Sequence, residues 1–328
     1  MLIIEPTAVT IKISHTVSFD SDLKMNYRIK YSEIAAAIPN YVTAGAYLTV
    51  EKDRYPAGGD PYVETVNLEA DLTADANRMI FTLGGIQSVE MGSELRATLH
   101  IFDSNGKEYV SQVDAYSILA YAQLCFDSYS YASQPKLYTL LIDTLNYGAA
   151  AQVFFNRNPE NLVNAGMDAY QQYATTALSE ELNDVRTYVD NDRSITAVKA
   201  MGFTVSFADK TELNAKLTLA SGNTKEDITC VKVTDADGNV LDTLTEYTVL
   251  SDGRLQVTYY GVKSIQMREM YYFTAYVGDE VASQAVGYSV EAYAKSNASS
   301  TNPALADTVL HCMYYGDSAF AYFASVNG

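Results

Sequence analysis

The sequence of 328 residues has no tryptophan, only three cysteines and three histidines, and 22 basic residues against 40 acidic ones. It contains no apolar run of about 18 residues, which excludes a transmembrane helix, so we expect no membrane insertion. The net charge of −18 disfavours contact with phosphate backbones and anionic lipids. Nucleic acid and membrane surfaces are therefore poor candidates as partners.

The scarcity of cysteine and histidine also limits the possible chemistry. Cys125 and Cys312 fall on apolar faces of predicted helices, and no paired spacing typical of zinc sites occurs. His15, His100 and His311 stand outside every common catalytic or metal-binding motif. We therefore expect a protein that is not an enzyme, with no cofactor and no metal site.

Acidic loops offer only weak alternatives to that expectation. DADGNVLDTLTE at 235–246 places oxygen side chains at several positions of a calcium loop, but Val240 stands where the sharp turn needs glycine. A hairpin turn explains the same letters. The Asp-rich stretches at 20–22 and 190–192 could hold a weakly bound cation, although solvated loop charge is the favoured interpretation.

The chain does contain an internal repeat. The matching pairs are YSILAYA at 116–122 with YSVEAYA at 288–294, PKLYTLLIDTLNYG at 135–148 with PALADTVLHCMYYG at 303–316, and FTLGGIQSVEM at 81–91 with VTYYGVKSIQM at 257–267. All keep one order along the chain, which is typical of duplication. We therefore expect two tandem modules, 1–187 and 188–328.

Each module is predicted to begin with strands and to end with helices, an α+β fold. Met25, Tyr27, Ile29 and Tyr31 alternate with polar residues, as in a strand with one buried face, and Asp/Asn-Gly turns punctuate later strands. Short strands at such spacing favour an immunoglobulin-like β-sandwich. The predicted segments are sandwich 1–111 with helices 112–187, and sandwich 188–285 with a helical hairpin 286–328.

The predicted helices follow a clear apolar periodicity. Pro135 and Pro303 suit the first turn of the second helix in each module. Asp317 is a polar exception in the apolar stripe of the last helix. Residues 158–185 are expected to add a third helix and the linker to the second module.

Gly148 lies inside TLNYGAAAQVFF, and Gly316 lies at the matching place of the second module. A helical glycine costs about 1 kcal/mol relative to alanine, so a reason for it is expected. A phosphate loop would need several glycines after a strand, and a helix end conflicts with the helical pattern that continues. We therefore expect close packing of the second helix on the first, with Ala120 or Ala292 as the small partner.

The 27 tyrosines are the most unusual part of the composition. Most of them fall at inward positions of predicted elements, which core packing explains. Tyr55, Tyr62, Tyr129 and Tyr131 lie in two loops, where exposed rings could stack on sugars. Against a sugar platform, these four have no counterpart in the second module. A structural role is therefore the favoured explanation, and the four tyrosines are the alternative ligand-binding candidates.

GIQSVEMGSELRATLHIFDSNGKEYVS, YSILAYA and LIDTLNYGAAAQVFF resemble modules of large secreted or cell-surface proteins of gut anaerobic Gram-positive bacteria. The second copy, with GVKSIQM, YSVEAYA and MYYGDSAFAYF, looks like a shorter form of the same module. The resemblance implies an extracellular or cell-surface location and an accessory role, and it transfers no catalytic residues.

The combined expectation is a non-catalytic, acidic surface protein for adhesion, spacing or scaffolding. Its partner would be a protein or a glycan at the cell surface. A carbohydrate-binding accessory module is the first alternative, and a virion or filament surface subunit is the second.

Overall fold

The structure is a computed structural model, which describes residues 5–19, 23–56, 59–191, 193, 195–207 and 210–326. It confirms the α+β class, with 27% helix and 36% strand in several sheets. The chain forms two compact units, 1–174 and 175–328. The compact units divide at 174/175, because residues after Thr175 contact the second unit. The expected module boundary at 187/188 concerns the duplicated sequence and stays a prediction.

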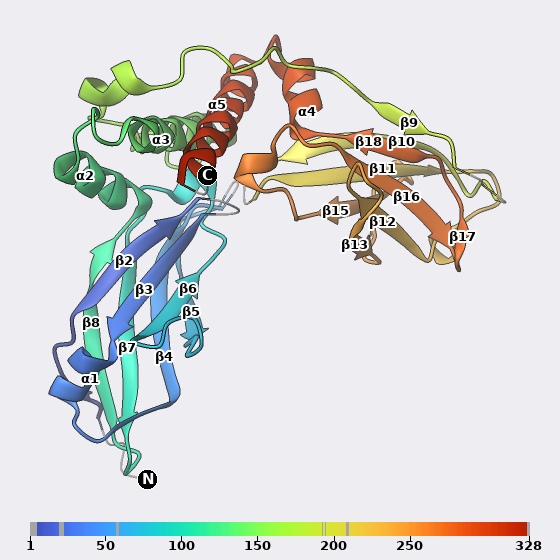
Figure 1. The fold of residues 1–328 in the computed structure, drawn as a ribbon. Coiled ribbons are helices and arrows are strands. Elements are labelled where there is room, and N and C mark those ends of the chain that lie inside the picture. The colour runs from blue at the N-terminus through green and yellow to red at the C-terminus, as the bar shows by residue number, and fades with distance from the viewer. Residues whose placement is uncertain are drawn as a thin grey trace. The chain divides into compact units, whose positions relative to one another are not determined.

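Unit 1 contains a five-stranded and a three-stranded sheet, both drawn in blue to cyan in Figure 1. The first sheet has the order β1 (Thr7–Ala8), β8 (Glu108–Tyr116), β7 (Leu95–Asp103), β4 (Tyr41–Arg54) and β5 (Tyr62–Glu69). The second has the order β2 (Ile13–Ser18), β3 (Lys24–Lys30) and β6 (Arg78–Leu83). All pairs are antiparallel except β1 with β8, which is parallel.

The core of unit 1 follows the predicted alternation. Met25, Tyr27 and Ile29 of β3 are fully buried, as are Leu99 and Ile101 of β7. The polar residues between them point away from this core, so one face of each sheet is apolar. Burial of these side chains is the main source of the unit's stability.

The helices of unit 1 are α1 (Tyr31–Ala37), α2 (Ile118–Ser128) and α3 (Pro135–Phe155), with short 3-10 helices η1 (Ser88–Glu90) and η2 (Asp168–Tyr173). In Figure 1, α2 and α3 lie beyond the end of β8. Pro135 opens α3 as expected, because its missing N–H leaves no helical bond unmade there.

Three local expectations differ from the structure of unit 1. Tyr31 begins α1 and does not continue β3. Strand β8 runs through Tyr116, so the helices start later than the expected residue 112. Residues 158–185 form only η2 and no third α-helix. Left-handed Asn156 and Asn158 turn the chain out of α3, and Pro159 follows them.

Unit 2 also contains two sheets. The first has the order β10 (Val198–Ser206), β11 (Glu212–Leu219), β15 (Leu255–Tyr259) and β14 (Thr248–Val249). The second has the order β13 (Val240–Leu244), β12 (Cys230–Thr234), β16 (Tyr271–Val277), β18 (Ala285–Tyr288) and β9 (Thr187–Val189), and β17 (Glu280–Val281) pairs with β16. On β11 of the first sheet, the inward residues Leu213, Ala215 and Leu217 are fully buried.

The helices of unit 2 are α4 (Val290–Asn297) and α5 (Pro303–Val326), together with η3 (Lys225–Asp227) and η4 (Ser264–Gln266). Helix α4 follows β18 after one residue, and α5 runs back beside α4 (Figure 1). Within the described part of the chain, no helix combines the length and apolar character that a membrane crossing requires.

Candidate functional site

The two helical glycines lie against the 3-10 helices rather than against the neighbouring α-helix. A Cβ on Gly148 would lie 2.9 Å from Sδ of Met91 and 3.0 Å from the carbonyl oxygen of Ser88. A Cβ on Gly316 would lie 2.7 Å from Cγ of Met267 and 3.3 Å from the carbonyl oxygen of Ser264. Helices α3 and α5 therefore approach η1 and η4 closely, and only glycine leaves enough room.

Ala120 and Ala292 have a different role from the one expected. They do not supply the atoms nearest to the glycines. Instead, the Ala120 backbone N–H donates to Oγ of Ser117 at 3.0 Å, and the Ala292 N–H donates to Oγ of Ser289 at 3.0 Å. Each serine is thus the N-cap of the first helix, which leaves fewer helix-end N–H groups unpaired.

The same segments are joined by a further backbone bond in each unit. The Leu119 N–H donates to the carbonyl oxygen of Met91 at 3.1 Å, and the Glu291 N–H donates to that of Met267 at 3.0 Å. The methionine after each 3-10 helix therefore contacts the glycine of one helix and the first turn of the other. We call this arrangement the turn clamp.

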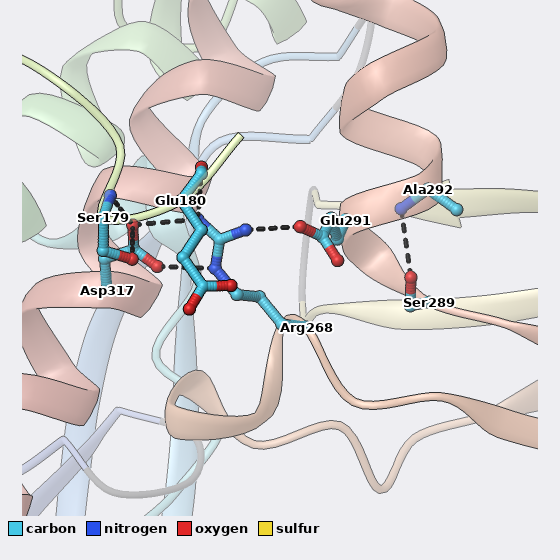
Figure 2. A network of polar contacts seen from close by, with 7 residues as sticks. All are labelled: Ser179, Glu180, Arg268, Ser289, Glu291, Ala292 and Asp317. Atoms are coloured by element: carbon cyan, nitrogen blue, oxygen red, sulfur yellow. Dashed lines mark hydrogen bonds and ion pairs between the residues drawn. The ribbon is translucent and has the colours of Figure 1, made fainter. Parts of the chain in front are cut away.

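Unit 2 adds a charged network to its turn clamp, shown in Figure 2. Nε and Nη2 of Arg268 donate to Oδ1 and Oδ2 of Asp317 at 2.9 and 3.0 Å. Nη1 donates to the carboxylate of Glu291, and Nη2 also reaches the carbonyl oxygen of Glu180 at 3.4 Å. Oδ2 of Asp317 accepts from the backbone N–H and hydroxyl of Ser179 at 2.9 and 2.8 Å.

The network is mostly shielded from solvent, with side-chain exposures of 23% for Arg268, 11% for Asp317 and 10% for Glu291. Burial alone would raise the pKa of Asp317, but hydrogen bonds from Arg268 and Ser179 outweigh it and hold that pKa below its ordinary value. The Asp317 hydrogen bond in turn raises the pKa of Arg268. Both groups are therefore charged near neutral pH.

This network is specific to unit 2. Gly92 follows Met91 at the position of Arg268, Leu119 stands at that of Glu291, and Ala149 stands at that of Asp317. In unit 1 the space is filled by Val163, whose Cγ2 would lie 3.4 Å from a Cβ on Gly92. The loop that carries Val163, which follows α3, thus covers the turn clamp of unit 1. Residues 179–180 cover the turn clamp of unit 2.

The predicted tyrosine candidates are separated in the structure. Tyr62 is 53% exposed, Tyr129 49% and Tyr131 39%, whereas Tyr55 is half-buried. The Tyr131 ring stacks on Tyr173 at a centroid distance of 4.1 Å, so one face of it is covered. Tyr55 and Tyr62 belong to the β4–β5 end of the sheet, and Tyr129 and Tyr131 to the α2–α3 connection. No ring contact among the described residues joins the two pairs.

A polar cluster that the sequence did not reveal lies on the outward face of the first sheet. The His100 ring stacks on Tyr47 with centroids 4.2 Å apart and planes 6° from parallel. Its Nδ1 is 2.7 Å from Oε1 of Glu108, and its Nε2 is 3.3 Å from Oγ1 of Thr49. Oγ1 of Thr49 is also 3.0 Å from Oδ1 of Asn67. Four neighbouring strands each contribute to this cluster.

The cluster contains a carboxylate, an imidazole and a hydroxyl, the same three kinds of group that many nucleophilic sites use. The resemblance is limited to the kinds of group present. The Thr49 hydroxyl can give its proton to Oδ1 of Asn67 at 3.0 Å or to Nε2 of His100 at 3.3 Å, and the His100 tautomer decides which. Nucleophilic catalysis requires that proton to pass to the imidazole. The cluster is better described as a hydrogen-bonded polar surface.

The acidic loops fit the interpretation as turns. Oδ1 of Asp235 accepts from the backbone N–H groups of Asp237 and Asn239 at 3.0 and 2.8 Å, which closes the hairpin between β12 and β13. Asp190 accepts from Gln284 at 2.6 Å, while residues 20–22 and Asp192 lie outside the described residues. Within the described ranges, no group of three His, Cys, Asp or Glu side chains is arranged to hold a metal ion.

The cysteines and remaining histidines pack within the fold. Cys125, Cys230 and Cys312 are buried, and burial raises the pKa of Cys125 and Cys230. His15 stacks on Tyr116 at 4.4 Å, and burial lowers its pKa. Such inert, buried thiols are typical of core residues.

No protein-family model matches the chain, and no curated protein is significantly similar to it.

Proposed function

We propose that the chain is a non-catalytic surface protein outside the cell that serves adhesion, spacing or scaffolding. The observation that carries this proposal is the turn clamp, because Gly148 and Gly316 make equivalent contacts with η1 and η4. A repeated, tightly braced unit suits a protein that holds or displays a surface. The acidic charge and the resemblance to surface modules also support an extracellular location.

The finer architecture belongs to the same proposal. The two units are tandem copies, each an immunoglobulin-like β-sandwich followed by a helical hairpin. Supporting observations are two sheets per unit and the shared order of 3-10 helix, N-cap serine and glycine-bearing helix. The N-cap bonds of Ser117 and Ser289 have the same length of 3.0 Å.

The braced units explain how the chain would act as a spacer. Each helix pair is held by backbone bonds, a cap and a close glycine contact, so it resists displacement from its sheets. In unit 2, Arg268 and Asp317 also bind residues 179–180, which lead into the unit. A segment held by a shielded ion pair and several hydrogen bonds is stiffer than a free linker.

Protease treatment of intact cells tests the location. Cells that produce the full chain are treated with a non-penetrating protease, and the chain is followed with an antibody beside a cytoplasmic marker. Loss of the chain while the marker stays intact would support the proposal. Survival of the chain until the cells are lysed would overturn it.

Adhesion is tested separately with beads coated in the purified chain. Retention on cells or immobilised host glycoproteins above that of albumin-coated beads would support an adhesive role. If surface exposure holds but retention equals the control, spacing or scaffolding remains as the function.

A carbohydrate-binding accessory role is the second candidate, favoured by the exposed rings of Tyr62 and Tyr129. Exposed aromatic rings stack on sugar faces. Binding to a glycan array that is abolished by Tyr55→Ala or Tyr129→Ala would favour this role.

A further inference from the structure

A groove opens beside the polar cluster on the outward face of the first sheet. It is an open depression of about 570 Å³ between residues 43–47 of β4 and residues 67–72 at the end of β5. Its polar lining includes Thr43, Asn67 and Glu69. Small-ligand sites commonly have volumes of about 300–1,000 Å³, so the groove is large enough for one or two sugar rings.

A bulge in β4 forms one wall of this groove. Val42 pairs with Phe102 and Tyr47 pairs with His100, so residues 43–46 face only Ile101 between these pairs. The β4–β5 ladder starts at the pair of Tyr47 with Glu69. Residues 43–46 therefore stand outside the paired positions of both ladders, and within this bulge Ala44 and Gly45 are exposed whereas Ala46 is buried.

Gly45 lies in the middle of the bulge at φ +77°, and a Cβ there would meet no atom within 4 Å. The glycine is thus needed for the left-handed backbone and not to avoid a neighbour. Ala44 and Gly45 are both exposed to solvent. Bulges of this kind often mark binding regions.

The second wall carries Asn67, whose amide ends a chain of hydrogen bonds. Glu108, His100, Thr49 and Asn67 are linked in that order at 2.7, 3.3 and 3.0 Å. If His100 Nε2 donates, the Thr49 hydroxyl donates to the Asn67 carbonyl, and the amide NH₂ faces away from Thr49. If Nε2 accepts, the Thr49 hydroxyl donates to it, and a flipped Asn67 donates to Thr49.

The two arrangements determine what Asn67 offers to the groove. In the first it presents a donor, and in the second it presents an acceptor. A ligand hydroxyl can donate or accept, so it complements both arrangements. Glu69 adds a carboxylate that accepts hydrogen bonds from hydroxyls, and it repels an anionic ligand.

We propose that this groove binds a neutral polyhydroxylated ligand, a glycan, through Asn67, Glu69 and the exposed bulge residues Ala44 and Gly45. The proposal rests on the proposed surface function and specifies the ligand class of its adhesive role. The site is separate from the exposed tyrosine candidates, because the groove lining includes neither Tyr62 nor Tyr129.

The test uses the full chain on an array that holds neutral and acidic glycans, followed by titration calorimetry with the best neutral glycan. Asn67→Ala and Glu69→Ala are each expected to weaken binding about tenfold, which corresponds to one lost hydrogen bond of about 1.4 kcal/mol. Thr65→Ala is the matched control, since Thr65 is an exposed residue of the same strand outside the groove. Unchanged thermal unfolding shows that each variant is folded.

Three results would each show that the groove is not the binding site. They are that the chain binds no neutral glycan, that it binds acidic glycans more tightly than neutral ones, or that the Asn67→Ala and Thr65→Ala variants bind the glycan with equal affinity. Binding lost in Tyr129→Ala but kept in Asn67→Ala would move the sugar site to the tyrosines. A chain that is exposed on cells but binds no neutral glycan overturns only the groove, whereas an internal location overturns the surface function itself.

Discussion

Arg268 and Asp317 form a bidentate ion pair, with Nε–Oδ1 and Nη2–Oδ2 distances of 2.9 and 3.0 Å. The two residues lie 49 positions apart, one just after η4 and one in α5, so the pair ties the turn clamp of unit 2 across its helix. Two parallel hydrogen bonds fix the orientation of both groups, which a single contact does not.

Arg268→Ala is expected to destabilise unit 2 by about 3 kcal/mol, because it leaves the shielded carboxylates of Asp317 and Glu291 without their cation. Urea unfolding of the full chain measures the loss. Arg254→Ala is the matched control, since Arg254 pairs with Asp252 at side-chain exposures of 38% and 51%. Exposed pairs contribute only about 0–1 kcal/mol. Equal losses in the two variants would refute the structural importance of the network.

The pH dependence of unit 2 follows from Asp317. Its pKa in the folded state lies below its ordinary value, so folding favours the ionised carboxylate. The resulting stability is fully present above the ordinary pKa of 3.8 and is lost as the pH falls through the lower folded value. Unfolding curves of the wild type and Asp317→Asn between neutral and strongly acidic pH should converge at the acidic end. A constant difference across that range would contradict the assignment.

The sequence predicted the parts of the fold that depend on local pattern. Alternation identified the buried face of β3, and Pro135 marked the start of α3. It gave only a hint of the charged network, through Asp317 as a polar residue in an apolar stripe. Arg268 lies in a loop, where no periodicity shows which residue it will meet. Its partners become visible only when α5 is packed on η4.

The polar cluster could not be predicted for a related reason. Thr49, Asn67, His100 and Glu108 each look like ordinary outward residues of a strand. Strand order decides that they meet, and that order depends on long-range pairing. The sequence likewise indicated close packing at Gly148 but not its partner, because η1 lies far before α3 along the chain, with β7, β8 and α2 between them, and no local pattern links the two.

Gly148→Ala is expected to destabilise unit 1 by about 1–3 kcal/mol, the usual cost of overpacking. Its added Cβ would lie within 3.0 Å of Val163, Met91 and the Ser88 carbonyl oxygen, and the last belongs to the backbone. Gly316→Ala should cost less, because its backbone contact, to the Ser264 carbonyl oxygen, is longer at 3.3 Å. Differential scanning calorimetry of the full chain measures both changes.

Gly202→Ala supplies the control for this comparison. A Cβ on Gly202 would meet only the Arg254 side chain, at 3.9 Å, so stability should stay the same or rise. The close-packing account fails if Gly148→Ala is as stable as the wild type. A double variant that also shortens Met91 should recover part of the loss if the two groups are in contact.

The serine caps provide the last test of the turn clamp. Ser117→Ala and Ser289→Ala should each destabilise their unit by about 1 kcal/mol, because the N–H of Ala120 or Ala292 loses its acceptor. Ser117→Asp and Ser289→Asp retain an acceptor, but both serines are buried, so a carboxylate there would be desolvated. Ser→Thr is therefore the better control and should keep most of the stability. Similar losses in the alanine variants of both units, measured by urea unfolding, would support equivalent clamps. A loss in only one unit would show that the shared geometry does not carry equal energy in the two units.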